Sequence, residues 1–255
     1  MILHVPHASR VIPADARASI VLGDAALERE LDLMTDSFTD VLAQRAVEGL
    51  ATSAQVIAAP VSRLAVDVER FPDEREVMNE VGMGAVYTRT HDGGVLRHEA
   101  DLALVARYGD PHARRVRDAV ARDLESAGAA VLIDVHSYPS RRLPYEIFPE
   151  EAHRPEICLG VDDDHTPPEL VDLARDAFGD FEVAINTPFA GTYVPLDYYG
   201  TDRRVASLMI EIRRDTYMDE ESVELHDDAD RVVAALRRLI GEGHGWGAAR
   251  VGGSH

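Results

Sequence analysis

The run AAVLIDVHSY, from Ala129 to Tyr138, constrains the fold of this chain more than any other stretch. Five consecutive apolar residues after a glycine predict a buried strand of an α/β sheet. The polar residues follow at its carboxyl end, where open α/β sheets place their ligand crevice. Asp134 and His136 share one face of this strand, because strand side chains alternate. The run therefore predicts an imidazole aimed at a ligand site, although a buried histidine bonded to a backbone carbonyl would fit the pattern equally well.

Length and composition indicate one globular domain. The chain has 255 residues, of which 45% are hydrophobic and 28% are charged, as is ordinary for a protein that buries a core. No linker, internal repeat or low-complexity block interrupts its middle. We therefore expect a single domain over residues 1–240 and a glycine-rich tail, frayed or disordered, over residues 241–255.

The charge of the chain excludes some partners. A formal net charge of −20 argues against binding to nucleic acid or to an anionic membrane, since both need a basic surface. An anionic small-molecule substrate would then need a local group of arginines. The absence of a signal-peptide pattern and the single cysteine, Cys158, predict a cytoplasmic protein without an internal disulfide. We expect a monomer or a small homo-oligomer.

Further runs predict an alternation of strands and helices around the central strand. A helical pattern begins at Asp24 and continues to Gly49, with Thr35 as a residue that could end it and cap a second helix. The glycine-rich run over residues 82–96 is typical of a loop, and it contains no phosphate-binding glycine motif. Strands are expected over residues 1–6, 54–59, 63–68, 144–148, 181–185 and 206–212, and helices over 110–128, 166–178 and 227–240.

Polar residues follow or interrupt several of these runs. His7 comes directly after the first strand, and Asp36 follows shortly afterwards, although by its local sequence alone Asp36 is more typical of a solvated carboxylate in the first turn of a helix. Glu211 lies inside the apolar strand ASLMIEI, where a carboxylate is costly unless it is paired, binds a metal or acts as a base. Two histidines and one carboxylate are an ordinary ligand set for catalytic zinc, with the fourth position left to water.

A group of charged residues lies in the segment SRLAVDVER over 62–70. Arg63 and Arg70 are the type of side chain that binds a carboxylate through two parallel hydrogen bonds. An internal pairing of these arginines with Asp67 is the alternative. Either interpretation places two positive charges close together in a chain whose net charge is strongly negative.

Six motifs spread along the chain form a combination that resembles one known family. They are PHAS at 6–9, TD at 35–36, SRLAVDVER at 62–70, DVHS at 134–137, NTPFAGTY at 186–193 and MIEIRRDTYMDE at 209–220. Together they resemble the N-formylglutamate amidohydrolase family over nearly the whole chain. The resemblance implies an α/β fold, a three-layer α/β/α sandwich with a mixed central sheet of the phosphorylase/hydrolase-like type. The resemblance further implies that zinc-dependent exopeptidases, among them metallocarboxypeptidases and cell-wall amidases, share this fold.

The resemblance also implies an activity and a set of site residues. The activity is zinc-dependent hydrolysis of a small N-acyl amino acid, giving formate and L-glutamate from N-formyl-L-glutamate, as in histidine degradation. Another divalent metal would also suit these ligands. By the same resemblance the metal ligands are His7, Asp36 and His136, with Asp67 as the rival of Asp36, the catalytic base is Glu211, and the substrate contacts are Arg63, Arg70, Asn186 and Tyr193.

Two departures from the family pattern concern the substrate. Glu69 stands before Arg70 where the family commonly has asparagine, and Thr192 and Val194 flank Tyr193 where glycine and a basic residue are common. The alternatives are therefore another zinc deacylase, a carboxypeptidase or a cell-wall amidase, or a binding protein that has kept the fold without catalysis. Asp134 is expected to orient His136 from behind.

Overall fold

The structure, a computed structural model, describes residues 1–51, 53–147 and 153–252. Its central element is a six-stranded sheet with the strand order β2-β1-β3-β6-β4-β5. β4 runs antiparallel to β6, and the other neighbouring strands are parallel, so the sheet is mixed as predicted. The strands are β1 (Ile2–Val5), β2 (Gln55–Ala58), β3 (Ala130–Tyr138), β4 (Ile157–Gly160), β5 (Val183–Ile185) and β6 (Val205–Arg213).

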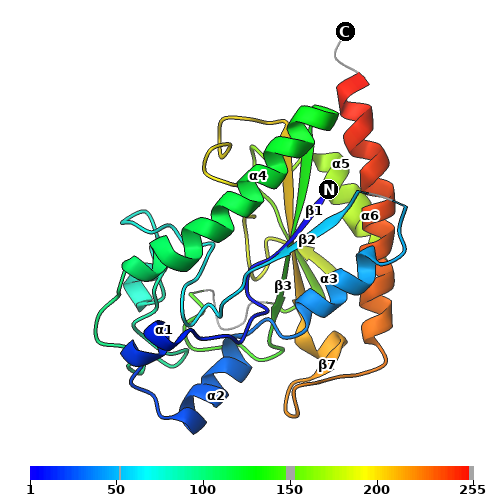
Figure 1. Cartoon of the computed structure of the whole chain (residues 1–255). Helices are drawn as coiled ribbons and strands as arrows, with labels where there is room; N and C mark the ends of the chain where they lie inside the picture. The colour runs from blue at the N-terminus through cyan, green and yellow to red at the C-terminus, as the bar shows by residue number, and fades with distance from the viewer. Residues whose placement is uncertain (52, 148–152, 253–255) are drawn as a thin grey trace.

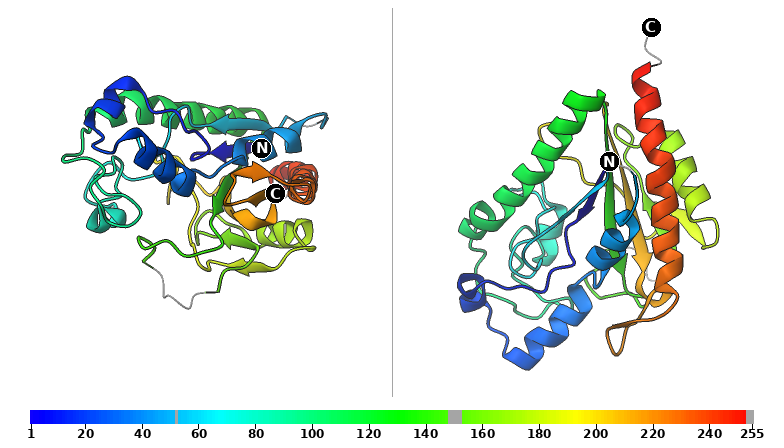
Figure 2. Two further views of the ribbon diagram at one scale, coloured as in Figure 1. Left: turned by 90° about the horizontal axis from the view of Figure 1, so that it is seen from below. Right: turned by 45° about the vertical axis from the view of Figure 1, so that its right-hand side comes forward.

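Helices cover both faces of this sheet, which gives three layers. α4 lies on one face, while α3, α5 and α6 lie on the other (Figures 1 and 2). The helices are α1 (Ala14–Ser19), α2 (Asp24–Met34), α3 (Thr39–Val47), α4 (Asp110–Ala127), α5 (Pro168–Ala177) and α6 (Ala229–Gly252). Short elements complete the chain, namely η1 (Val77–Val81), the π-helical turn η2 (Val105–Gly109), η3 (Arg214–Thr216), β7 (Met218–Asp219) and β8 (Glu224–Leu225). Among the helices of the described residues, none has both the length and the apolar composition that a membrane-spanning segment needs.

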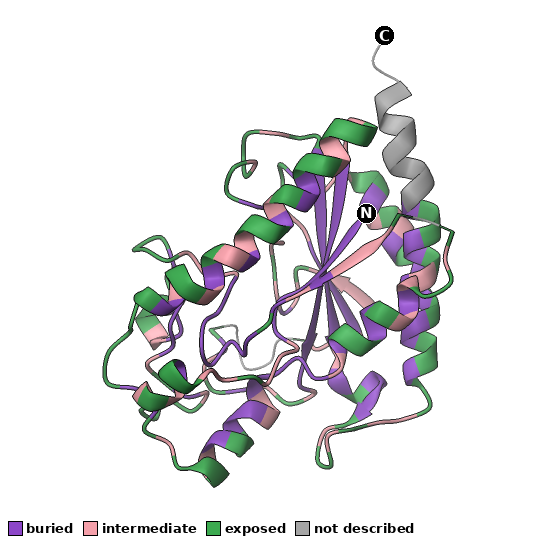
Figure 3. Cartoon of the chain, in the orientation of Figure 1, coloured by how far each residue is buried: buried purple, intermediate pink, exposed green. Residues whose placement is uncertain are grey.

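The central strand β3 is buried along its whole length, because layers of apolar side chains cover both its faces (Figure 3). Ala130 and Leu132 pack with the apolar side of α4, whereas Val131 belongs to the core on the opposite face. Side chains of a strand alternate between the two faces. His136 therefore projects to the α4 face, and so does Glu211, which is its partner in the parallel register of β3 and β6.

The helical pattern after Asp24 divides into two helices, the alternative that Thr35 had suggested. α2 ends at Met34 and α3 begins at Thr39. Phe38, between them, has a left-handed backbone with φ of 66°. Asp36 thus lies in the connection and not in the first turn of the second helix. The amide of Asp36 donates to the carbonyl of His7, at 3.0 Å, and this bond ties the connection to the end of β1.

Several predicted boundaries were wrong. Residues 63–68 form successive turns, because the carbonyl of Ser62 accepts from the amides of Ala65 and Val66. The expected strand over 144–148 is not a strand in its described part, 144–147, and Phe148 lies outside the described residues. β4 was not predicted, since its four residues are too short for a period to show. α6 continues to Gly252, past the predicted helix end at residue 240.

Candidate active site

Three side chains from separate parts of the chain converge at the carboxyl ends of β1 and β3. Nδ1 of His7 lies 3.2 Å from Nδ1 of His136, and Oδ2 of Asp36 lies 3.2 Å from His136 Nδ1 and 3.6 Å from His7 Nδ1. All three residues are buried. Ligands that surround a zinc ion tetrahedrally at about 2.0–2.1 Å are separated from one another by about 3.3 Å. The three atoms therefore have the mutual spacing of three corners of such a site.

The other side of each imidazole faces carboxylates. Nε2 of His7 is 2.9 Å from Oδ1 of Asp67, and Nε2 of His136 is 3.1 Å from Oδ2 of Asp134. A carboxylate behind an imidazole favours the tautomer with the proton on Nε2, and it leaves the lone pair of Nδ1 free for a metal. Nε2 of His7 is hydrogen-bonded to Asp67, whereas Nε2 of His136 lies at ion-pair distance from Asp134 without a hydrogen bond. With both rings in this tautomer, the two Nδ1 atoms would present lone pairs beside the Asp36 oxygen. This set of donor atoms is suited to binding a cation.

Glu69 offers a second way to complete a ligand set with the same histidines. His7, Glu69 and His136 present ligand atoms that lie within 4.8 Å of one another. Oε2 of Glu69 is 3.2 Å from His136 Nε2 and 3.8 Å from His7 Nε2. The Asp36 set is more compact, and in it the Nε2 atoms keep their carboxylates. Asp36 and Glu69 both lie where a third ligand to the two histidines would be, Asp36 on the Nδ1 side and Glu69 on the Nε2 side.

Two arginines hold the oxygen of Asp36 that faces away from the histidines. Oδ1 of Asp36 is 3.5 Å from Nη2 of Arg214 and 3.7 Å from Nη1 of Arg63. Arg214 is itself buried, and its Nη1 donates to the carbonyl of Leu33 at the end of α2, at 2.7 Å. These contacts orient Asp36 so that one oxygen is free for a ligand and the other is held by guanidinium groups.

Electrostatics attract positive charge to this position. Burial opposes protonation of His136, but the negative charges of Glu69 and Asp134 outweigh it and hold the pKa of His136 well above its usual value. The pKa of His7 is raised too, since Asp67 and Asp36 outweigh burial and Arg63. Burial would raise the pKa of Asp36, yet its hydrogen bonds with the two imidazoles lower it.

Glu211 lies beside this cluster as the strand pattern predicted. It is paired in register with His136 on β3 and with Cys158 on β4. Glu211 is 8% exposed, and its Oε2 has no hydrogen-bond partner among the described residues. Burial, assisted by the charge of Asp36, raises the pKa of Glu211 to about 7. A carboxylate with this pKa can accept and release a proton near neutral pH.

Comparison with known proteins bears on this arrangement. The sequence model of one protein family, described as N-formylglutamate amidohydrolase, matches residues 1–218. The chain belongs to this family. Among solved structures, the N-formylglutamate amidohydrolase from Ralstonia eutropha JMP134 is similar with a TM-score of 0.79 and 22% identity, over 98% of this chain and 94% of that one. A gene product of Agrobacterium tumefaciens is similar with a TM-score of 0.63 and 19% identity, over 99% and 91% of the two chains. No curated protein matches the sequence.

These comparisons confirm the fold and the reaction class. The match to the N-formylglutamate amidohydrolase family makes the chain an amidohydrolase-type hydrolase. Structural similarity below about a quarter identity shows the fold alone, and the α/β fold with a mixed six-stranded sheet agrees with the one expected from the resemblance.

The four residues predicted to contact the substrate have different surroundings in the structure. Arg63 is buried, and its guanidinium donates to Asp67 at 3.1 Å, so the internal pairing that was the alternative does occur. Arg70 is more accessible and lies 3.5 Å from Asp67. The ring of Tyr193 packs against that of His4 in a tilted arrangement, with ring centroids 4.6 Å apart. Asn186 accepts from the amide of Val161, at 2.9 Å, and its role in substrate binding stays a prediction.

Sequence reasoning missed two members of this cluster. Glu69 was noticed only as a departure from the family pattern, yet its carboxylate approaches three histidines. Arg214 was part of the MIEIRRDTYMDE motif without a role, and it holds Asp36. A buried arginine directly after the end of an apolar strand gives no local signal of its partner, because that partner comes from the distant α2–α3 connection.

Proposed function

We propose that the chain is a zinc-dependent hydrolase that cleaves the amide bond of an N-acyl amino acid, with N-formyl-L-glutamate as the first candidate substrate. The observation that supports this is the convergence of His7 Nδ1, His136 Nδ1 and Asp36 Oδ2 at separations of 3.2 to 3.6 Å. Membership of the N-formylglutamate amidohydrolase family supports the reaction class. Under this proposal the products are a carboxylic acid and an amino acid.

The donor set fits zinc on chemical grounds. Two imidazole nitrogens and one carboxylate oxygen are ordinary ligands of catalytic zinc, and a fourth position remains for water or substrate. His7, Asp36 and His136 would hold the ion, with Asp67 behind one imidazole and Asp134 behind the other. When bound, zinc would supply a Lewis acid and lower the pKa of a water molecule to about 7. Other divalent metals suit the same donors.

Glu211 is the general base in this proposal. Its carboxylate accepts a proton from the attacking water and then delivers that proton to the leaving nitrogen, so that amine and acid products form. Its position on the α4 face of the sheet, in register with His136, places it next to the proposed metal ligand. Its raised pKa, about 7, suits both steps near neutral pH.

Few positively charged groups near the site are available to bind an anionic substrate. Arg63 and Arg70 are the predicted contacts for a substrate carboxylate, and both already share the carboxylate of Asp67. Arg70 retains more freedom, since its side chain is 28% exposed against 10% for Arg63. We therefore assign the carboxylate contact of the substrate first to Arg70, with Tyr193 and Asn186 as the remaining proposed contacts.

Metal content and formate release test the proposal together. Zinc would be measured by plasma mass spectrometry in the wild type, in His136→Ala and in His153→Ala, whose imidazole is exposed and pairs with Glu182. We expect about one zinc per chain in the wild type and the control and almost none in His136→Ala. N-formyl-L-glutamate should release formate only in the two zinc-containing proteins. A wild type that takes up no zinc, or a His136→Ala protein with full activity, would contradict the proposal.

A further inference from the structure

A second group of candidate metal ligands adjoins the first and consists of His4, Glu69 and Asp134. Nδ1 of His4 is 2.9 Å from Oδ1 of Asp134 and 3.4 Å from Oε1 of Glu69. The ligand atoms of these three residues all lie within 4.8 Å of one another. Ligands that surround a small cation tetrahedrally at about 2.0–2.2 Å are separated by about 3.3 Å. The three atoms therefore have spacings that suit one shared cation.

The two carboxylates use different oxygens toward the two groups. Oδ2 of Asp134 and Oε2 of Glu69 lie 3.1 Å and 3.2 Å from Nε2 of His136. Oδ1 and Oε1 are the atoms that approach His4 instead. A cation beside His4 thus requires none of the three atoms proposed above as zinc ligands. The two sites do not compete for ligand atoms.

A neighbouring histidine favours the form of His4 that binds a metal. Nε2 of His4 is 2.8 Å from Nε2 of His112, and both residues are buried. Burial, assisted by the charges of His4 and Arg115, lowers the pKa of His112 to about 3, so its ring is neutral and can accept a hydrogen bond. His4 then donates from Nε2 and turns Nδ1 to the two carboxylates. Metal-bound histidines commonly donate their other ring N–H in this way.

A single proton does not satisfy both carboxylates at this position. When Nδ1 of His4 carries a proton, its hydrogen bond goes to Oδ1 of Asp134. Oε1 of Glu69 is buried and has no hydrogen-bond partner among the described residues. A buried carboxylate oxygen without a partner is costly. A metal ion, in contrast, would contact all three atoms at once.

The charges around His4 also favour a cation. In the described part of the chain, the ion pairs of Glu69 and Asp134 are formed with histidines and include no arginine. Burial opposes protonation of His4, but the two carboxylates outweigh it and raise the pKa of His4 to about 9. The same carboxylates attract a metal ion, which displaces the proton from Nδ1 when it binds.

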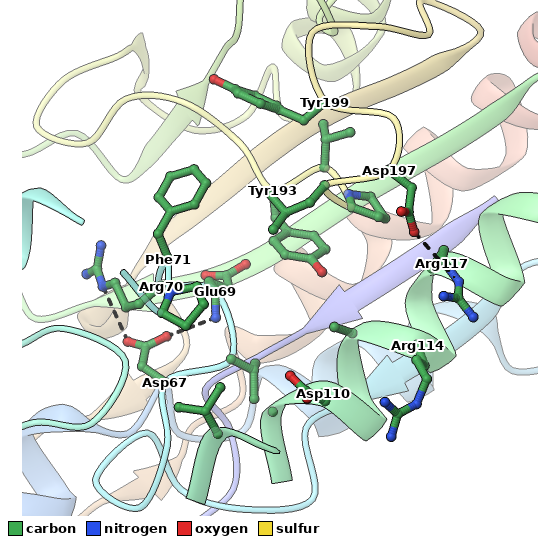
Figure 4. Close-up of a pocket in the computed structure, with 18 of the residues that line it drawn as sticks. Asp67, Glu69, Arg70, Phe71, Asp110, Arg114, Arg117, Tyr193, Asp197 and Tyr199 are labelled. Atoms are coloured by element: carbon green, nitrogen blue, oxygen red, sulfur yellow. Dashed lines mark hydrogen bonds and ion pairs between the residues drawn. The ribbon is translucent and has the colours of Figure 1, made fainter. Parts of the chain in front are cut away.

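A cavity of about 390 Å³ gives ions a path to this position. Glu69 and Tyr193 lie in its wall, across from α4 (Figure 4). Tyr193 packs against His4, and its amide donates to Oδ2 of Asp134 at 3.2 Å, so both ligands lie directly behind this wall. The lining mixes carboxylates and arginines, namely Asp67, Glu69, Asp110 and Asp197 with Arg70, Arg114 and Arg117. The cavity is therefore a passage, and the selectivity for a cation comes from the residues behind it.

We propose that His4, Glu69 and Asp134 bind a second divalent cation, of the Mn²⁺ type, beside the proposed zinc site. One imidazole nitrogen and two carboxylate oxygens form a harder ligand set than two imidazole nitrogens and one carboxylate oxygen. Carboxylate oxygens suit manganese and magnesium, whereas imidazole suits zinc. This second site goes beyond the proposed function and does not depend on it.

Such a cation would compensate the charge of Glu69 next to Arg70. Both residues line the cavity, and Arg70 is the first proposed contact for the substrate carboxylate. With Glu69 bound to a cation, a substrate carboxylate at Arg70 would meet less negative charge. This consequence, unlike the site itself, rests on the proposed function.

Manganese binding measured by electron paramagnetic resonance (EPR) tests the second site. The wild type would first receive one equivalent of zinc and then be titrated with Mn²⁺, whose free aqueous ion gives a signal that disappears on binding. We expect about one bound Mn²⁺ per chain without release of zinc. Pulsed EPR of the bound ion should detect one directly coordinated imidazole nitrogen.

Two variants and a matched control locate the bound ion. Glu69→Gln and His4→Gln should each weaken manganese binding by at least about tenfold, and His4→Gln should also remove the nitrogen coupling. The control is Asp110→Asn, an exposed carboxylate in the lining of the same cavity, which should bind manganese within about twofold of the wild type. Equal weakening by Glu69→Gln and Asp110→Asn would show only a general attraction of cations to the cavity, and it would overturn the assignment. If His4→Gln does not fold, Glu69→Gln and the nitrogen coupling of the wild type decide.

This outcome is distinct from that of the proposed function. If the wild type takes up no zinc, the proposed function fails, and the same titration of the metal-free proteins decides the second site through His4→Gln, since His4 is not a ligand of the first. Manganese that only replaces zinc, manganese bound equally by the wild type and His4→Gln, or no bound manganese would overturn the second site and leave the proposed function intact.

Discussion

Glu211→Gln should make the metal-free protein more stable and the enzyme much slower. The carboxyl of Glu211 has its pKa raised from 4.5 to about 7 by burial, so ionisation disfavours the folded state. Such a group costs nothing at low pH, where it is protonated both folded and unfolded. The penalty grows as the pH increases from about 4.5 to about 7 and is complete above that range. Glutamine resembles the protonated form and removes the penalty.

The size of the effect follows from the two pKa values. At about 1.4 kcal/mol for each pKa unit, the difference between 4.5 and about 7 corresponds to roughly 3 kcal/mol at pH 8. For a chain of this length, each kcal/mol changes the melting temperature by about 2–4 °C. Metal-free Glu211→Gln should therefore melt roughly 6–12 °C higher than the metal-free wild type at pH 8, and at nearly the same temperature at pH 4.

Thermal denaturation in excess chelator would measure this difference, with the exposed Glu125→Gln as the control. In the presence of zinc, the same variant should keep its metal and lose about 10²–10⁴ in kcat, as is typical for removal of a general base. Melting temperatures that do not diverge between pH 4 and pH 8 would refute the argument from burial. Turnover within tenfold of the wild type would refute the role of Glu211 as the base.

Two further predictions concern residues around the site. Arg214→Ala should weaken zinc binding by about 10–100-fold in competition with a chelator, because Asp36 loses a guanidinium that orients it. Arg214→Lys should recover part of that affinity. Lower stability with unchanged zinc affinity in both variants would show that Arg214 only supports the fold. Cys158 is fully buried, and burial raises the pKa of its thiol to about 12, so almost none of it is thiolate at pH 8. Alkylation of Cys158 should therefore be slow in the native protein and rapid after unfolding, as mass spectrometry would detect, and rapid modification of the native protein would contradict its place in β4.

The sequence by itself determined the parts of this protein that depend on short-range patterns. The apolar run of β3, the apolar run of β6 and the histidine after β1 were recognisable, since a buried strand in a parallel sheet is a continuous apolar segment. Because parallel strands bring their carboxyl ends to one edge, His7, His136 and Glu211 could be expected near one another. The resemblance of the motifs then placed Asp36 with them, and the structure brings it to hydrogen-bond distance of His136.

Only the tertiary structure decided which charged groups meet. The contact of Arg214 with Asp36 and the contact of Glu69 with His136 join segments that lie far apart in the chain. The pairing of Arg63 with Asp67, four residues apart, was one of two alternatives that the sequence left open, and the structure shows it. A charged residue in a loop has no periodicity that indicates its partner. Partner choice depends on the distances that the packed sheet and helices impose, and on the cost of burying a charge without a counter-charge. For that reason the strands could be predicted from the sequence, whereas the electrostatics of the site required the fold.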